Sequence, residues 1–163
     1  MDTASLAKLN QLHPKLRAIA IVAYTEACHQ TPVNVHPFIT EAWRSFNESE
    51  HLYQLGRTIV NPDGKSAAKP MGDIVSDATP GLSWHNYGLA FDIAFLVNGK
   101  EDYNANQVVT DIMKSHGFTW GGDFAGNFQD PPHFEMKYGY NIHQLLAKYL
   151  AKDFRPGTQY LNI

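Results

Sequence analysis

The stretch Ser83-Trp84-His85-Asn86-Tyr87-Gly88-Leu89-Ala90-Phe91-Asp92-Ile93 places one carboxylate inside an apolar run. Residues 89–97 have the composition of a buried strand, and Asp92 is the single charge in that segment. Burying a carboxylate is costly unless it is paired, hydrogen-bonded or bound to a cation. We therefore expect a hidden partner for Asp92; the simpler alternative is a structural aspartate that caps a neighbouring turn.

A second segment, Asp130-Pro131-Pro132-His133-Phe134-Glu135, supplies candidate partners. In a strand, His133 and Glu135 point to the same face because side chains alternate with period two. Together with His85 and Asp92, the segment offers two imidazoles and one carboxylate for a metal, with Asp130 as a spare acid. Two histidines and one aspartate with an open fourth position form a catalytic zinc arrangement. Eight histidines also allow accidental pairings, so spacing alone leaves ordinary surface or core histidines open.

Helices are predicted at both ends of the chain and in its middle. Leucines and alanines recur every three or four residues over 6–27, which predicts a helical hairpin or kinked helix that breaks at His13-Pro14. Asn47 and Glu50 have the spacing of a capping box and predict a helix over 48–55. Apolar residues spaced over 108–113 predict a further helix that ends at Gly117. A last helix is predicted to begin at Asn141.

Short strands and one long loop complete the expected fold. Strands are predicted over 33–40, 89–97 and 118–120, and Pro37 places the first at an edge or a bulge. The aperiodic stretch 57–82 is longer than compact domains usually carry without a use, so we expect it to face a substrate. The predicted fold class is α+β: a single compact domain over 1–163, with helices packed around a small antiparallel sheet that holds the metal site.

Composition excludes several classes of protein. The chain has 163 residues, 44% of them hydrophobic, and a formal net charge of −3, so it can form a core but has no positive field for nucleic acid. No apolar run approaches the ~20 residues that span a membrane, and the start lacks the pattern of a signal peptide. Cys28 is the only cysteine, so a metal site must use His, Asp or Glu.

The motifs together resemble a known family. The pattern Ser-x-His-x-x-Gly-x-Ala-x-Asp over 83–92, Trp-Gly-Gly-Asp over 120–123 and Asp-x-x-His-Phe-Glu over 130–135 resembles the VanY-type D,D-carboxypeptidase and L-alanyl-D-glutamate peptidase family. Segments 39–45 and 52–57 are similar to that family's arginine segment and the helix after it. The resemblance covers roughly 10–150 in the family's order.

The resemblance implies a role for each matched residue. It makes His85, Asp92 and His133 the ligands of Zn²⁺, Asp130 the general base that activates water, and Arg44 the group that polarises the scissile carbonyl. Ser83 matches a substrate-contacting hydroxyl, and Trp84 and Tyr87 are expected to contact substrate, with packing in the core as the alternative. Independently of the resemblance, we expect Glu135 to orient a ligand histidine.

The function implied is zinc-dependent hydrolysis of the L-alanyl-D-glutamate bond in peptidoglycan stem peptides, as in phage endolysins. A D-alanyl-D-alanine carboxypeptidase or dipeptidase shares the same zinc residues and is the alternative. From another class, the hedgehog signalling domain is a relative that keeps a zinc site, so a wall-binding module without catalysis is the third interpretation. We expect a monomer made in the cytoplasm, which a holin or a secretion machine delivers to the cell wall. The scissile bond, the route and the exact metal stay open.

Overall fold

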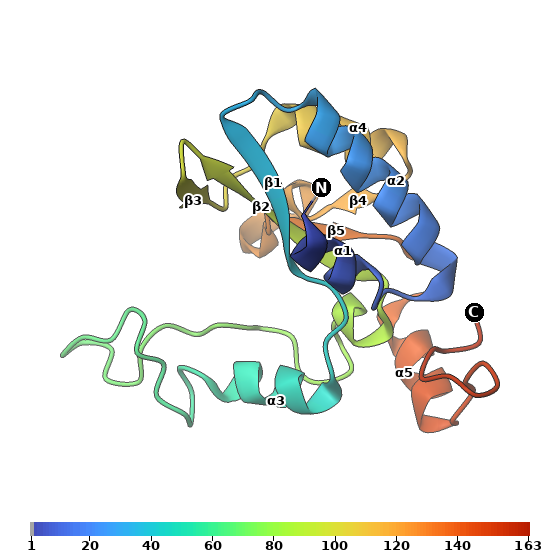
Figure 1. The fold of residues 1–163 in the computed structure, drawn as a ribbon. Helices are drawn as coiled ribbons and strands as arrows, with labels where there is room; N and C mark the ends of the chain where they lie inside the picture. The colour runs from blue at the N-terminus through green and yellow to red at the C-terminus, as the bar shows by residue number, and fades with distance from the viewer. Residues whose placement is uncertain (1) are drawn as a thin grey trace.

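A five-stranded sheet forms the centre of the molecule (Figure 1). The computed structural model describes residues 2–163, and its strands run in the order β1-β2-β5-β4, with β3 paired to β2. All pairs are antiparallel. Their bounds are β1 (Val35–Glu41), β2 (Ala90–Val97), β3 (Lys100–Asp102), β4 (Thr119–Trp120) and β5 (His133–Glu135). β1 lies at an edge, as Pro37 predicts, and it carries a bulge further along, between Ile39 and Glu41.

The two faces of the sheet have different tasks. Phe91 pairs with Phe134 across β2 and β5, and their rings stack with centroids 6.1 Å apart in the hydrophobic core. One position further along, Asp92 pairs with His133. Because side chains alternate along a strand, the aromatic pair and the polar pair lie on opposite faces. The sheet therefore buries one face against helices and presents polar groups on the other.

Helices α1 (Thr3–Leu9), α2 (Pro14–Gln30) and α4 (Gln107–Ser115) cover the apolar face (Figure 1). The break between α1 and α2 falls at His13-Pro14 as predicted, and the His13 ring caps α2 by accepting a hydrogen bond from the Lys15 backbone. Buried leucines, alanines and Tyr24 of α1 and α2 join the strand residues in one core. The expected α+β class is confirmed.

Helix α3 (Phe46–Gln54) begins earlier than the sequence analysis predicts. The side chain of Ser45, and not that of Asn47, accepts from the Glu48 backbone at 3.1 Å and caps the helix. Ser45 and Glu48 have the same capping spacing as Asn47 and Glu50, so the sequence holds two overlapping signals. The Asn47 cap was wrong because the earlier signal sets the first turn.

Beyond α3, residues 57–82 form an arm that projects from the body and returns to it (Figure 1). The arm closes on itself, since the backbone nitrogen of Asn61 bonds the Met71 carbonyl and that of Asp73 bonds the Asp63 carbonyl. The chain then enters the short 3-10 helix η1 (Trp84–Tyr87), which leads into β2.

Helix α5 (Ile142–Leu150) starts at Asn141 with the capping box to Gln144 that the sequence predicts. Two short 3-10 turns, η2 (Gly121–Asp123) and η3 (Gly126–Phe128), lie between β4 and β5. None of the described helices combines the length and apolar character that crossing a bilayer requires.

Candidate metal centre and active site

Three predicted ligands meet on the polar face of the sheet. His85 comes from η1, Asp92 from β2 and His133 from β5. His85 Nε2 lies 3.2 Å from His133 Nδ1 and 3.3 Å from Asp92 Oδ1, and His133 Nδ1 lies 3.1 Å from Asp92 Oδ1. The hidden partners expected for Asp92 are thus the two histidines.

These spacings fit a tetrahedral metal. Metal–nitrogen and metal–oxygen distances of ~2.0–2.1 Å place neighbouring ligand atoms about 3.3 Å apart. The three atoms form such a triangle, and among the described residues these three side chains make a group able to hold a metal ion. Without a cation, the two ring nitrogens and the carboxylate oxygen are three acceptors that face one another, unless one ring carries a proton there. A bound cation would remove this repulsion. Two imidazoles and one carboxylate suit zinc and related divalent ions.

Other groups fix the orientation of each ring. His85 Nδ1 donates to the Ala42 carbonyl at 2.7 Å, which leaves Nε2 free to face the other ligands. His133 Nε2 lies 3.1 Å from Glu135 Oε2, so Nδ1 is the nitrogen of that ring that faces His85 and Asp92. Glu135 is 2% exposed, and a buried carboxylate behind a ligand histidine is a common support in metal sites.

The electrostatics of the cluster favour a cation. Burial alone would raise the pKa of Asp92, but His85 and His133 hold that pKa well below its ordinary value. Burial opposes charge on His133 as well, yet the hydrogen bonds that its ring donates to the Asp92 and Glu135 carboxylates raise its pKa to about 9. Both shifts show that the site stabilises a positive charge between the carboxylates.

Two glycines allow the approach of the segments that carry these residues. Gly88 ends η1 at φ +66°, and a Cβ there would lie 2.7 Å from the His13 nitrogen, which donates to the Gly88 carbonyl. A Cβ on Gly121 would lie 2.3 Å from the Asp130 carbonyl oxygen, which accepts from the His133 nitrogen at 3.1 Å. Close backbone approach at Gly121 thus places Asp130 beside the predicted ligands.

Asp130 lines the same cleft as the ligands. Partial burial raises the pKa of its carboxyl, and the negative charge of Asp92 raises it further. A raised pKa suits a group that accepts and returns a proton near neutral pH.

Arg44 lines the cleft from the segment that follows β1. Its backbone nitrogen donates to the His85 carbonyl at 3.1 Å, and its Nη2 pairs with Glu41 at 3.3 Å. Its Nε is buried and has no hydrogen-bond partner among the described residues. The guanidinium therefore keeps donor capacity for a ligand.

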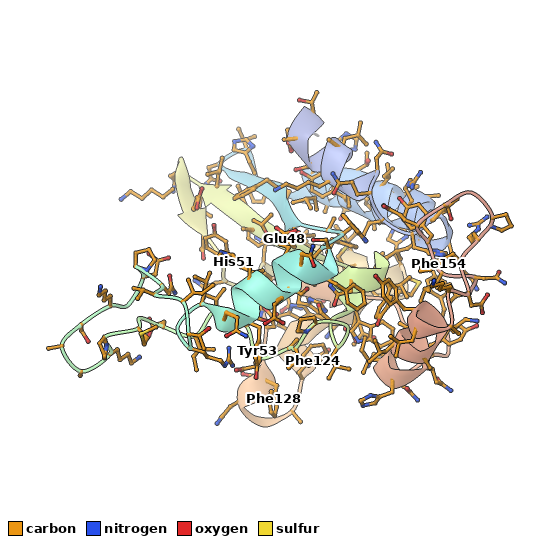
Figure 2. The ribbon with its side chains drawn as sticks, turned by 90° about the horizontal axis from the view of Figure 1, so that it is seen from below. Glu48, His51, Tyr53, Phe124, Phe128 and Phe154 are labelled. Atoms are coloured by element: carbon orange, nitrogen blue, oxygen red, sulfur yellow. The ribbon has the colours of Figure 1, made fainter. Side chains whose placement is uncertain are left out.

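The cleft has a volume of about 800 Å³. One side comes from α3 and the end of the arm, and the other from the loop over 124–130. Figure 2 views this side of the molecule, with Tyr53 on α3 and with Phe124 and Phe128 on the loop. The end of the arm lines the cleft as predicted, but the part over 59–73 does not.

The expected substrate contacts divide into two groups. Ser83 and Trp84 line the cleft. Tyr87 does not, and the expectation for it is corrected: its ring is 4% exposed in the core and its hydroxyl donates to the Gly81 carbonyl at 2.7 Å. The turn of η1 directs Tyr87 inward, so the core alternative holds.

Sequence reasoning missed Lys137 and the aromatic residues Phe124 and Phe128, all of which line the cleft. Lys137 had a signal, because it continues the period-two spacing of His133 and Glu135. The loop aromatics had none, since a loop lacks periodicity.

An α+β domain with a His-Asp-His centre in an open cleft, flanked by an acid and an arginine, defines a metal-dependent hydrolase. Comparison with known proteins narrows the class. A family model described as D-alanyl-D-alanine carboxypeptidase matches residues 76–136. The chain is also 35% identical over 139 residues to peptidoglycan L-alanyl-D-glutamate endopeptidase CwlK of Bacillus subtilis (strain 168), covering 78% of this chain and 74% of the relative. The chain belongs to the VanY-type D,D-carboxypeptidase and L-alanyl-D-glutamate peptidase family, and is a metallopeptidase.

A solved structure shares the fold. The crystal structure of the Serratia marcescens L-Ala D-Glu endopeptidase ChiX superposes with a TM-score of 0.54 at 18% sequence identity. The match covers 85% of this chain and 90% of that one. The recognition made on sequence motifs is thus confirmed, and so is the fold expected from it.

Proposed function

We propose that this protein is a zinc-dependent endopeptidase that hydrolyses the L-alanyl-D-glutamate bond of peptidoglycan stem peptides. The observation that carries the proposal is the meeting of His85, Asp92 and His133 in one cleft with Asp130 and Arg44. The relation to CwlK, whose name gives this bond, favours it over other bonds.

In this proposal His85 Nε2, Asp92 Oδ1 and His133 Nδ1 hold the zinc ion. Zinc supplies Lewis acidity when it is bound, which lowers the pKa of water and polarises a carbonyl group. Glu135 keeps the His133 ring in the tautomer that binds through Nδ1.

Asp130 accepts a proton from the attacking water and returns it to the leaving amine. Support comes from its position in the cleft and from the raised pKa of its carboxyl. Peptide hydrolysis needs both transfers, since water loses a proton as it attacks and the amine gains one as it leaves.

Arg44 donates to the scissile carbonyl oxygen as that oxygen gains negative charge. Its unpartnered Nε is consistent with this role. Ser83 and Trp84 bind the peptide backbone and side chains along the wall of the cleft.

The proposal extends to the domain and to its delivery. We infer that residues 1–163 act as one zinc peptidase domain, since the three predicted ligands, Asp130 and Arg44 all line one cleft, and that the protein acts as a monomer. As an endolysin-like enzyme, it reaches the cell wall through a holin or a secretion machine.

Digestion of purified sacculi that contain meso-diaminopimelate tests the proposal. The soluble and insoluble products are analysed by mass spectrometry, with zinc-stripped protein and Asp130→Asn protein beside the native enzyme. New D-glutamyl amino termini, with L-alanine left on the glycan, are expected only with zinc and Asp130. Cleavage of another bond, or the same products from all three samples, would contradict it.

A second candidate, D-alanyl-D-alanine carboxypeptidase, is favoured by the description of the matching family model. The same digest separates it, because that activity releases D-alanine and leaves the L-alanyl-D-glutamate bond intact.

A further inference from the structure

We propose that Lys137 binds the free carboxylate of the glutamate residue on the leaving-group side of the scissile bond. The inference rests on the proposed function and names a specificity residue for it. Lys137 lies outside the motifs that identify the family, and it is not one of the three residues that could hold a metal ion.

The position of Lys137 follows from the strand that carries His133. Lys137 comes two residues after Glu135 and lines the cleft. Its Nζ lies 3.1 Å from Glu135 Oε1, while Glu135 Oε2 lies 3.1 Å from His133 Nε2. One carboxylate therefore separates the lysine ammonium from a metal-ligating ring.

Contacts hold the ammonium beside the wall of the cleft. Its Nζ lies 5.7 Å from the centre of the Trp84 ring, and Trp84 also lines the cleft. The Lys137 side chain is nevertheless 49% exposed. An ammonium has three N–H donors, so the bond to Glu135 leaves donors for a ligand.

The distribution of charge in the cleft points to an anion at this place. Arg44 and Lys137 are the only lysine or arginine side chains among the described residues that line it. Arg44 follows β1 and Lys137 follows β5, with β2 between these strands in the sheet. The two cations thus flank the metal ligands from different sides. If Arg44 acts on the carbonyl oxygen, Lys137 is left for a second negative group.

The substrate carries such a group. In an L-alanyl-D-glutamate unit, the glutamate nitrogen belongs to the scissile amide, and one of its two carboxyl groups continues the peptide. The other carboxyl group is free and ionised at neutral pH. A peptide that ends in D-alanyl-D-alanine offers instead its terminal carboxylate, so the choice of partner for Lys137 bears on the choice of bond.

Two synthetic stem peptides test the assignment: one with the free glutamate carboxylate, and one in which that carboxylate is a carboxamide. Both are assayed with zinc-loaded native protein and with Lys137→Met, Lys137→Arg and Lys100→Met proteins. Lys100 is an exposed lysine of β3 outside the cleft and serves as the matched control. Dissociation constants of both peptides are measured in the Asp130→Asn background, and metal content is measured for every variant.

We expect native protein to prefer the carboxylate peptide about tenfold in kcat/KM and in affinity, as the loss of one charge-assisted hydrogen bond implies. Lys137→Met should reduce this preference to less than twofold, because it should lower kcat/KM and affinity only for the carboxylate peptide. Lys137→Arg should restore most of it, and Lys100→Met should leave it unchanged.

If Lys137→Met lowered kcat/KM equally for both peptides, the assignment would be overturned, because the lysine would then act through Glu135 and His133. A native enzyme that cleaves both peptides equally well would overturn it too, while leaving the proposed function intact. A native enzyme that cleaves neither peptide, but releases D-alanine from sacculi, would contradict the proposed function and the assignment together.

Discussion

His133 and Glu135 stand two residues apart on β5, and the ring nitrogen that faces away from the metal site lies 3.1 Å from a Glu135 carboxylate oxygen. Glu135→Gln replaces that charged acceptor with an amide of similar shape. We expect metal affinity to fall about 10- to 100-fold, as for other carboxylates that support a ligand histidine. Competition with a chelator measures the change, and Glu101→Gln, on exposed β3, is the control. Unchanged affinity would mean that Glu135 serves Lys137 alone.

Asp130 and Asp92 line the same cleft, but replacing each with asparagine should affect metal content and activity differently. Asp130→Asn removes the proposed proton acceptor, so we expect kcat to fall about 10²- to 10⁴-fold with metal content unchanged. Asp92→Asn removes a proposed metal ligand, so we expect both metal and activity to be lost. Elemental analysis beside a peptide assay separates the two outcomes, with Asp111→Asn, on the exposed side of α4, as control. Loss of metal from Asp130→Asn would instead make Asp130 a ligand.

Arg57 ties the returning end of the arm to α3. Its Nη1 donates to the Tyr53 and Ser76 carbonyls at 2.6 and 2.8 Å, and its Nη2 pairs with Asp77 at 3.2 Å. Ser76 and Asp77 line the cleft, so the arginine positions one wall. Arg57→Lys cannot bridge all three groups. We expect kcat/KM to fall about tenfold, mostly through KM, with metal content unchanged.

Steady-state kinetics on a stem peptide checks the role of Arg57, with Arg155→Lys, an exposed arginine outside the cleft, as control. A fall in kcat alone would show that Arg57 acts on the chemical step, and no change would show that the arm holds its place without it.

His13 should make stability depend on pH. Its Nε2 donates to the Leu161 carbonyl at 2.9 Å and its Nδ1 accepts from Lys15, so the neutral ring is needed. Burial lowers the pKa of His13 below 6.5. The unfolded chain then binds a proton that the folded chain does not, so stability falls as pH drops below about 6.5, by at most about 1.4 kcal/mol per pH unit.

Chemical denaturation between pH 5 and 8 measures this slope. His13→Asn keeps a capping side chain but does not titrate, so it should be less stable at pH 7.5 and show a flatter slope. His143→Asn, at an exposed position, should keep the native slope. A native slope in His13→Asn would assign the effect to other groups.

Much of the site could be predicted because two short segments obey period two. The polar face of the sheet is predicted by Asp92 inside an apolar strand and by the pair His133 and Glu135. Tyr87 could not be placed that way, since η1 turns with a period of three and directs it into the core. The His-Asp-His meeting itself depends on strand pairing between positions far apart in the chain.

Other errors came from signals that were present. Strand β3 was missed, although Asn98 and Gly99 both adopt positive φ in the turn that pairs it with β2. Asn-Gly between two extended segments is a strong hairpin signal. The position of α3 was misjudged because two capping patterns overlap, and only packing chooses between them.

The separation of the ligands along the chain has one more consequence. His85 and His133 lie 48 positions apart. A metal ion bound by both histidines would therefore close a long loop that is open in the unfolded chain. Binding to the folded chain alone adds about 2.7 kcal/mol of stability when free metal is a hundred times its dissociation constant. We therefore expect resistance of the enzyme to proteases to rise with the local concentration of free metal and to fall where the ion is scarce.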